Sequence, residues 1–212
     1  MAEPEIMKGT TTIGIVFKDG VVLATEKRAT MGYMIASKRA KKVYQIADRI
    51  GMTTAGGVGD AQQLARIMTV ESRLFQMRRE KPITVGAAST LLSNYLNQNR
   101  GYPFYVQLLV GGVDRTGPSV YSVDALGGAT REDDIVATGS GSPMAYGVLE
   151  DRYRRDMTED EAIELAVRAL KAAMRRDSGS GEGYHVVVIT PDRYEDLGEE
   201  RAEQIADAAK AA

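Results

Sequence analysis

Hydrophobic and polar residues alternate along the first quarter of the chain and predict short strands there. Residues 11–18 alternate and end at Asp19-Gly20, a dipeptide that favours a two-residue hairpin turn. Residues 33–36 and 43–46 flank a basic run and predict a second hairpin. Apolar runs predict further strands in this region and later in the chain: 21–25, 50–55, 104–113, 119–124, 135–138 and 184–190.

Apolar positions with helical spacing separate these groups of strands. Asp60 is expected to cap one helix, and Pro82 is expected to begin a second. Thr158-x-x-Glu161 is a capping box that opens a clearly amphipathic helix. Two further segments also have helical character: 143–153 and the Ala-rich tail 199–212. Strands that alternate with pairs of helices predict an α+β layered sandwich in one domain.

Composition narrows the range of possible chemistry. The 212 residues contain no cysteine and one histidine, His185, which excludes thiolate catalysis, disulfides and multi-histidine metal centres. A net charge of −2 gives no general attraction to nucleic acid or membranes. No apolar run is long enough to span a membrane. Residues 1–9 carry acidic residues and no apolar centre, unlike a secretory signal, so a cytoplasmic protein is expected.

The junction Gly9-Thr10 is a candidate for self-processing. Cleavage after Gly9 would leave Thr10 with both a hydroxyl nucleophile and a free α-amine. An α-amine has a pKa of roughly 7.7–8.0 and is therefore a base near neutral pH. The alternative is that Thr10, Thr11 and Thr12 simply favour the start of a strand.

Two charged clusters follow this junction. Glu26 ends the strand that returns toward Thr10, although a solvated charge cluster is the alternative. The basic run 37–42 has two interpretations: a patch that binds nucleic acid or phosphate, or a plain exposed loop. A third interpretation turns Lys42 inward, where a buried ammonium would need a carboxylate partner such as Glu26.

Three loops are rich in glycine, and two of them also contain serine. Residues 55–60 form a strand-to-helix turn whose glycines match a dinucleotide-binding loop only in part, and a glycine there can also present its N–H to a reacting carbonyl. Residues 138–143 and 176–181 are Ser-Gly loops, where small hydroxyl residues often act as caps. His185 is most simply a packed strand residue.

The motifs in this order closely resemble the proteasome β-subunit family, and archaeal members most. The resemblance covers nearly the whole chain after residue 9. Six motifs carry it: Gly9-Thr10-Thr11-Thr12, Thr25-Glu26, Lys41-Lys42, Ala55-Gly56-x-x-Gly59-Asp60-Ala61, Gly139-Ser140-Gly141-Ser142-Pro143 and Arg176-Asp177-Ser178-x-Ser180-Gly181.

The resemblance implies the N-terminal-nucleophile hydrolase fold, a four-layer αββα sandwich of two antiparallel sheets between helix layers. It also implies a threonine endopeptidase with Thr10 as nucleophile. Lys42 matches the lysine that keeps the site electropositive. Glu26 matches the acid that holds this lysine, at a position where many relatives have Asp. Gly56 matches the backbone N–H that stabilises the oxyanion.

Further positions match supporting and substrate-binding residues of the family. Ser140, Asp177 and Ser180 match the network around the threonine amine and hydroxyl, and Thr30 matches the residue that pairs with the substrate backbone. Four small or apolar residues match the specificity pocket and imply cleavage after hydrophobic residues: Ala29, Ala40, Thr54 and Val58.

By the same resemblance, residues 1–9 are a propeptide that is lost by autocatalytic cleavage between Gly9 and Thr10. Residues 10–212 then form a single catalytic domain. Gly9 has no side chain, which lets the Thr10 hydroxyl approach the preceding carbonyl. The precursor should be inactive, because an amide nitrogen cannot act as a base.

The family also implies partners. These are other β subunits in a heptameric ring, proteasome α-subunit rings, and a regulatory ATPase that supplies unfolded polypeptides. No cofactor, metal, nucleic acid or membrane is expected. Two alternatives remain: a non-catalytic structural ring subunit, and a bacterial-type two-ring threonine protease.

Overall fold

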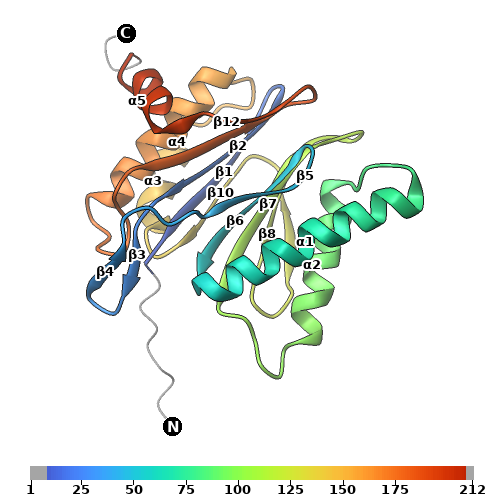
Figure 1. The fold of residues 1–212 in the computed structure, drawn as a ribbon. Coiled ribbons are helices and arrows are strands. Elements are labelled where there is room, and N and C mark those ends of the chain that lie inside the picture. The colour runs from blue at the N-terminus through green and yellow to red at the C-terminus, as the bar shows by residue number, and fades with distance from the viewer. Residues whose placement is uncertain (1–8, 209–212) are drawn as a thin grey trace.

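Two five-stranded antiparallel sheets lie face to face at the centre of the structure, a computed structural model that describes residues 9–208 (Figure 1). Three helices cover the outer face of one sheet, and two helices cover the outer face of the other. The predicted α+β class and the four-layer αββα sandwich are therefore confirmed.

The first sheet contains the N-terminal hairpin. Its strand order is β10 (Ile135–Gly139), β1 (Thr11–Phe17), β2 (Gly20–Glu26), β11 (Tyr184–Ile189) and β12 (Tyr194–Asp196). Its covering helices are α3 (Ser142–Arg152), α4 (Glu159–Met174) and α5 (Gly198–Ala208). The predicted tail helix is thus found, although residues 209–212 of that prediction lie outside the described part of the chain.

The second sheet follows the chain order through the middle of the sequence. Its strands are β5 (Val43–Ala47), β6 (Ile50–Gly56), β7 (Val106–Asp114), β8 (Gly117–Val123) and β9 (Ala129–Glu132). Its covering helices are α1 (Val58–Arg79) and α2 (Val85–Gln98). A separate two-stranded hairpin, β3 (Ala29–Met31) and β4 (Met34–Ser37), projects beside the sandwich (Figure 1).

Apolar side chains fill three layers because each sheet is buried on both faces. One cluster lies between the first sheet and α3, α4 and α5, and a second lies between the other sheet and α1 and α2. The third cluster lies between the sheets and includes Leu23, Leu109 and Val136. Gly14 on β1 faces this middle layer, where an added Cβ would lie 2.9 Å from Val120 Cγ1. The two sheets are therefore in close contact at the middle of β1.

The predicted hairpin between 33–36 and 43–46 is wrong. β4 pairs with β3, and β5 pairs with β6. Gly32, at a φ of +60°, closes the short β3–β4 turn. The basic run then carries the chain from this hairpin to the second sheet, where the Thr54 N–H donates to the Lys42 carbonyl at 2.9 Å.

Two predicted helix starts are also wrong, whereas the capping box is confirmed. Asp60 lies inside the first turn of α1, and its carboxylate accepts the Tyr105 N–H at 2.9 Å. Thr84, not Pro82, caps α2 by accepting the Ala87 N–H. Thr158 caps α4 with the reciprocal bond from Glu161.

Hairpin register places the two ends of β1 and β2 together. Thr12 lies opposite Thr25, so Glu26 lies beside Thr11 at the open end of the hairpin. Lys42 lies directly before β5, and Gly56 ends β6 in the other sheet. The candidate residues therefore meet at one end of the sandwich, between the two sheets.

Among the helices of residues 9–208, none combines the length and the apolar character that crossing a membrane requires.

Leu109 provides a test of the middle apolar layer. Leu109→Ala removes a fully buried side chain between the sheets and is expected to lower the free energy of unfolding by about 2–5 kcal/mol. Urea unfolding measures this loss. Val70→Ala, on an exposed position of α1, is the control and should change stability by less than about 0.5 kcal/mol. Equal effects of the two substitutions would contradict the assignment of this layer.

Candidate active site

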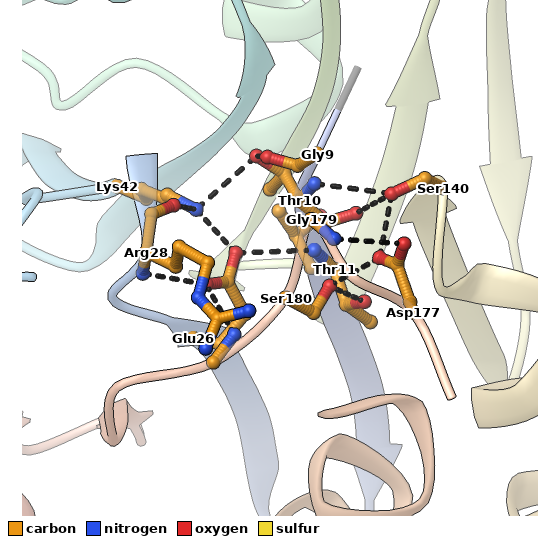
Figure 2. Close-up of polar contacts among 12 residues, drawn as sticks. Gly9, Thr10, Thr11, Glu26, Arg28, Lys42, Ser140, Asp177, Gly179 and Ser180 are labelled. Carbon is orange, nitrogen blue, oxygen red and sulfur yellow. Dashed lines mark hydrogen bonds and ion pairs between the residues drawn. The ribbon is translucent and has the colours of Figure 1, made fainter. Parts of the chain in front are cut away.

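Thr10 lies at the entrance of β1 and is almost fully buried, with 4% of its surface exposed. Figure 2 shows its hydroxyl between the backbone of Gly9 and the side chain of Lys42. The Thr10 hydroxyl donates to the Gly9 carbonyl oxygen. It accepts a hydrogen bond from Lys42 Nζ at 3.1 Å. The hydroxyl therefore contacts both the carbonyl that precedes it and a buried cation.

Lys42 uses all three donors of its ammonium group inside the protein. Besides Thr10 Oγ1, Nζ donates to Glu26 Oε1 and to the Arg28 carbonyl oxygen. The lysine is 6% exposed and Glu26 is fully buried. A buried ammonium is tolerated only when its donors are paired, and here every donor has an acceptor.

The Glu26 carboxylate also has a complete set of partners. Oε1 accepts the Thr11 N–H at 3.3 Å in addition to Lys42. Oε2 accepts the N–H groups of Arg28 at 2.6 Å and Gly181 at 3.1 Å. The three N–H donors belong to three separate segments of the chain, so Glu26 fixes the position of Lys42 relative to β1 and the loop at 176–181.

Burial shifts the pKa values of this pair toward each other. Burial lowers the pKa of Lys42, and the nearby Glu26 charge opposes that shift. Burial raises the pKa of Glu26, and Lys42 opposes it in turn. Both charged forms are thus disfavoured by desolvation and favoured by their partner. An ammonium with a lowered pKa gives up a proton more readily than a surface lysine does, which suits a group in contact with a hydroxyl.

A second network surrounds the Thr10 nitrogen. The Thr10 N–H donates to Ser140 Oγ at 3.2 Å, and Ser140 Oγ donates to Asp177 Oδ2 at 2.6 Å. Ser180 Oγ donates to the same Asp177 oxygen at 2.6 Å and also bonds with Thr11 Oγ1 at 2.7 Å. Asp177 therefore joins the two Ser-Gly loops on one side of Thr10 (Figure 2).

Gly56 ends β6 in a conformation that requires glycine. Its φ is +118°, and an added Cβ would lie 2.0 Å from the Tyr105 carbonyl oxygen. No other residue fits this position without displacing the backbone. The role of its N–H as an oxyanion donor stays a prediction.

Gly9 and Gly179 are in direct backbone contact. An added Cβ on Gly9 would lie 2.5 Å from Gly179 Cα, and one on Gly179 would lie 2.1 Å from Gly9 Cα. The added Cβ on Gly9 would also lie 2.8 Å from Thr30 Oγ1, so Thr30 lies beside the residue that precedes Thr10. The rest of the predicted propeptide, residues 1–8, lies outside the described residues.

The residues predicted for the specificity pocket differ in exposure. Ala29 and Ala40 are half-buried, and Thr54 is buried beside Lys42 through its backbone bond. Val58, at the start of α1, is 52% exposed. Their role in substrate selection stays a prediction.

Sequence reasoning did not assign a role to Arg28 or Thr11. Arg28 NH1 donates to the Ser178 carbonyl oxygen at 2.7 Å, and NH2 donates to Glu182 at 3.2 Å. Its side chain therefore joins the end of β2 to the loop that carries Asp177. Thr11 contacts both Glu26 and Ser180. Both residues stand beside predicted site residues in sequence. Their contacts with the loop at 176–181 and with Glu182 join positions 150 or more residues apart, so the sequence offers no local signal for them.

The other singled-out residues stay outside this network. Lys38 forms a long ion pair with Glu182 at 3.8 Å, and Lys41 Nζ lies 5.7 Å from the centre of the Tyr44 ring. His185 Nε2 contacts Asp196 Oδ2 at 2.8 Å on the first sheet. Of the basic run, Lys42 is thus the residue that enters the site.

Comparisons with known proteins identify similar chains. A family model described as "Proteasome subunit" matches residues 6–189. The proteasome subunit beta of Methanosphaerula palustris is 82% identical over 204 residues, which cover 96% of this chain and 97% of the relative. That of Methanoregula boonei is 80% identical over 196 residues, 92% of each chain. The Archaeoglobus profundus protein of the same name is 64% identical over 203 residues, 96% of this chain and 94% of the relative.

Removing one member of the buried ion pair is expected to destabilise the protein in a pH-dependent manner. Lys42→Met leaves Glu26 buried without its cation and should lower the free energy of unfolding by about 3–5 kcal/mol at pH 8. The loss should be smaller at pH 5, because burial raises the pKa of Glu26 and the folded state takes up a proton there. Urea unfolding at the two pH values measures the difference.

The control is the double variant Glu26→Gln/Lys42→Met, which contains no buried charge. It should regain most of the stability and lose the pH dependence. An equal loss at pH 5 and pH 8 for Lys42→Met would contradict a buried, charged Glu26.

Proposed function

The chain belongs to the proteasome subunit family, and on that basis we propose that it is a catalytic β subunit of the proteasome core particle. Its activity is that of a threonine endopeptidase, which hydrolyses unfolded polypeptides to peptides. One observation carries this proposal: Lys42, held by Glu26, contacts the Thr10 hydroxyl in a buried site. A surface threonine at a strand start would need no such cation.

Peptide hydrolysis begins with attack of Thr10 Oγ on the substrate carbonyl carbon. The hydroxyl proton passes to the free α-amine of Thr10, directly or through water, and then to the leaving amine as the peptide bond breaks. Water hydrolyses the resulting ester and restores the hydroxyl. Lys42 stabilises the developing negative charge on Oγ, and Ser140 with Asp177 orients the Thr10 nitrogen.

Maturation uses the same nucleophile on the chain's own backbone. Thr10 Oγ attacks the Gly9 carbonyl carbon, the C–N bond breaks, and the proton passes to the Thr10 nitrogen. Water then hydrolyses the ester between Gly9 and Thr10, which releases residues 1–9. The contact of the Thr10 hydroxyl with the Gly9 carbonyl group supports this step, as does the absence of a Gly9 side chain.

Assembly follows from the family. The proposed arrangement is a heptameric ring of β subunits that stacks with α-subunit rings in the cytoplasm, and a regulatory ATPase supplies unfolded chains. A bacterial-type two-ring particle is the alternative, and particle length by electron microscopy separates the two. High identity to archaeal chains named proteasome subunit beta favours the first arrangement.

Thr10→Ala tests both reactions. In particles assembled with α subunits, this variant should lose peptide hydrolysis by on the order of a thousandfold or more, because no nucleophile remains. Intact mass should show that it retains Gly9, whereas the wild-type chain begins at Thr10. Thr10→Ser keeps a hydroxyl and should retain both peptide hydrolysis and self-cleavage after Gly9.

Wild-type activity in Thr10→Ala would instead favour a non-catalytic structural subunit. An uncleaved wild-type chain with full peptidase activity would rule out the proposed maturation.

Cleavage specificity is tested separately. The small and apolar residues Ala29, Ala40, Thr54 and Val58 favour acceptance of hydrophobic side chains before the scissile bond. A fluorogenic peptide panel should give the highest kcat/KM for hydrophobic residues at that position. A preference for acidic or basic residues by tenfold, about 1.4 kcal/mol, would contradict this specificity.

A further inference from the structure

The candidate site is divided between the two sheets. Thr10 leads into β1 of the first sheet, whereas Gly56 ends β6 of the second. The distance between the nucleophile and the predicted oxyanion donor therefore depends on how the sheets are placed against each other. Apolar packing in the middle layer attracts the sheets without directional preference. Hydrogen bonds have defined lengths and angles and can fix this placement.

Three threonine hydroxyls form a hydrogen-bonded chain at this end of the sandwich, and one of its two bonds joins the sheets. Thr53 Oγ1 on β6 donates to Thr12 Oγ1 on β1 at 3.0 Å. Thr12 Oγ1 also bonds with Thr138 Oγ1 on β10 at 2.7 Å. Thr12 and Thr53 are fully buried, and Thr138 is half-buried. We call Thr12, Thr53 and Thr138 the threonine bridge.

Each member of the threonine bridge stands close in sequence to a different part of the site. Thr12 follows the nucleophile by two residues, Thr53 precedes Gly56 by three, and Thr138 precedes Ser140 by two. A rigid strand transmits a displacement at one residue to its near neighbours. The bridge thus links the three short segments that carry the nucleophile, the predicted oxyanion donor and the serine beside the Thr10 nitrogen.

A second polar link lies beside the bridge. Gln107 Oε1 on β7 of the second sheet accepts the N–H of Gly139, at the end of β10 in the first sheet, at 3.1 Å. Gly139 has a φ of +92° and directly precedes Ser140. Two independent hydrogen-bonded connections between the sheets therefore converge on the segment that holds Ser140.

Burial of these hydroxyls costs desolvation free energy, and strand formation does not require them. Valine has the same shape as threonine, favours strands as well, and needs no hydrogen bond in an apolar layer. A buried hydroxyl must be paired, and its net contribution to stability is small. These three paired hydroxyls therefore add little to the stability of the protein. The bond between Thr53 and Thr12 can still fix the alignment of the two sheets.

We propose that Thr12, Thr53 and Thr138 are positioning residues that set the spacing of the two sheets, so that Thr10 Oγ faces a carbonyl held at Gly56. This inference rests on the proposed threonine peptidase function. It assigns to the bridge an effect on kcat that is separable from its effect on stability. An error of about 1 Å between nucleophile and oxyanion donor is large enough to slow a reaction substantially.

The triple variant Thr12→Val/Thr53→Val/Thr138→Val provides the main test, in particles assembled with α subunits. It keeps the side-chain shapes and leaves no bridge hydroxyl unpaired, so its unfolding temperature should stay within about 4 °C of wild type. Its kcat for a fluorogenic peptide should fall about tenfold or more, with KM changed less than about twofold. Rates are expressed per chain that begins at Thr10, as counted by intact mass, so incomplete maturation does not count as slow catalysis.

Two further readouts separate positioning from a purely structural role. The pH profile of kcat/KM should keep its shape, because the variant leaves Lys42 and Glu26 in place. Thr53→Ser restores the hydroxyl and should keep at least about half of the wild-type kcat, whereas Thr53→Val should lose most of it. Thr190→Val is the matched control. Thr190 is buried directly after the end of β11, and its hydroxyl has no hydrogen-bond partner within the described chain. This variant should have the wild-type kcat.

A triple variant with wild-type kcat per processed chain would overturn the inference, as would equal kcat values for Thr53→Ser and Thr53→Val. The second comparison decides the matter if the triple variant does not assemble. Failure of the proposed function is recognised separately, because Thr10→Ala would then retain peptide hydrolysis.

Discussion

The buried ion pair between Lys42 and Glu26 constrains this end of the molecule more than any other single contact. Two charges removed from water are tolerated only when their remaining donors and acceptors are paired. Glu26 meets this requirement with N–H groups from β1, from its own strand end and from the loop at 176–181. The hydrogen bonds that hold Lys42 beside Thr10 therefore also hold these three segments of the fold together. If one of these hydrogen bonds is lost, a buried charge loses one of its partners, and the folded state is destabilised.

Most of the layer order could be predicted from the sequence, because strand alternation and the Thr158 capping box are local signals. The errors arose where the deciding contact is distant. Asp60 resembles a helix cap, yet its carboxylate accepts the N–H of Tyr105, the residue directly before β7. The basic run resembles a hairpin loop, yet one end of it must enter the interior to meet Glu26. Charge density in a sequence does not show which of several lysines is buried.

The candidate site was predictable to a different degree for each residue. Hairpin register alone brings Glu26 near Thr10. The two turn residues are Lys18 and Asp19, one position before the predicted Asp19-Gly20, and this turn fixes which residues of β1 and β2 face each other. Ser140 and Asp177 were predicted only from the family resemblance. The two Ser-Gly loops contain no local signal that their side chains contact each other. Arg28 was not assigned at all. Its guanidinium contacts residues about 150 positions away, and such a contact becomes visible only after the sheets are assembled.

The contact between Gly9 and Gly179 has a consequence for which substitutions the chain tolerates. The three atoms nearest to an added Gly179 Cβ all belong to Gly9, a residue that the proposed maturation removes. If that maturation occurs, a side chain at 179 is excluded mainly by a segment that the mature chain lacks. The precursor then sets the steric limit at position 179, through a contact that the mature chain would not contain.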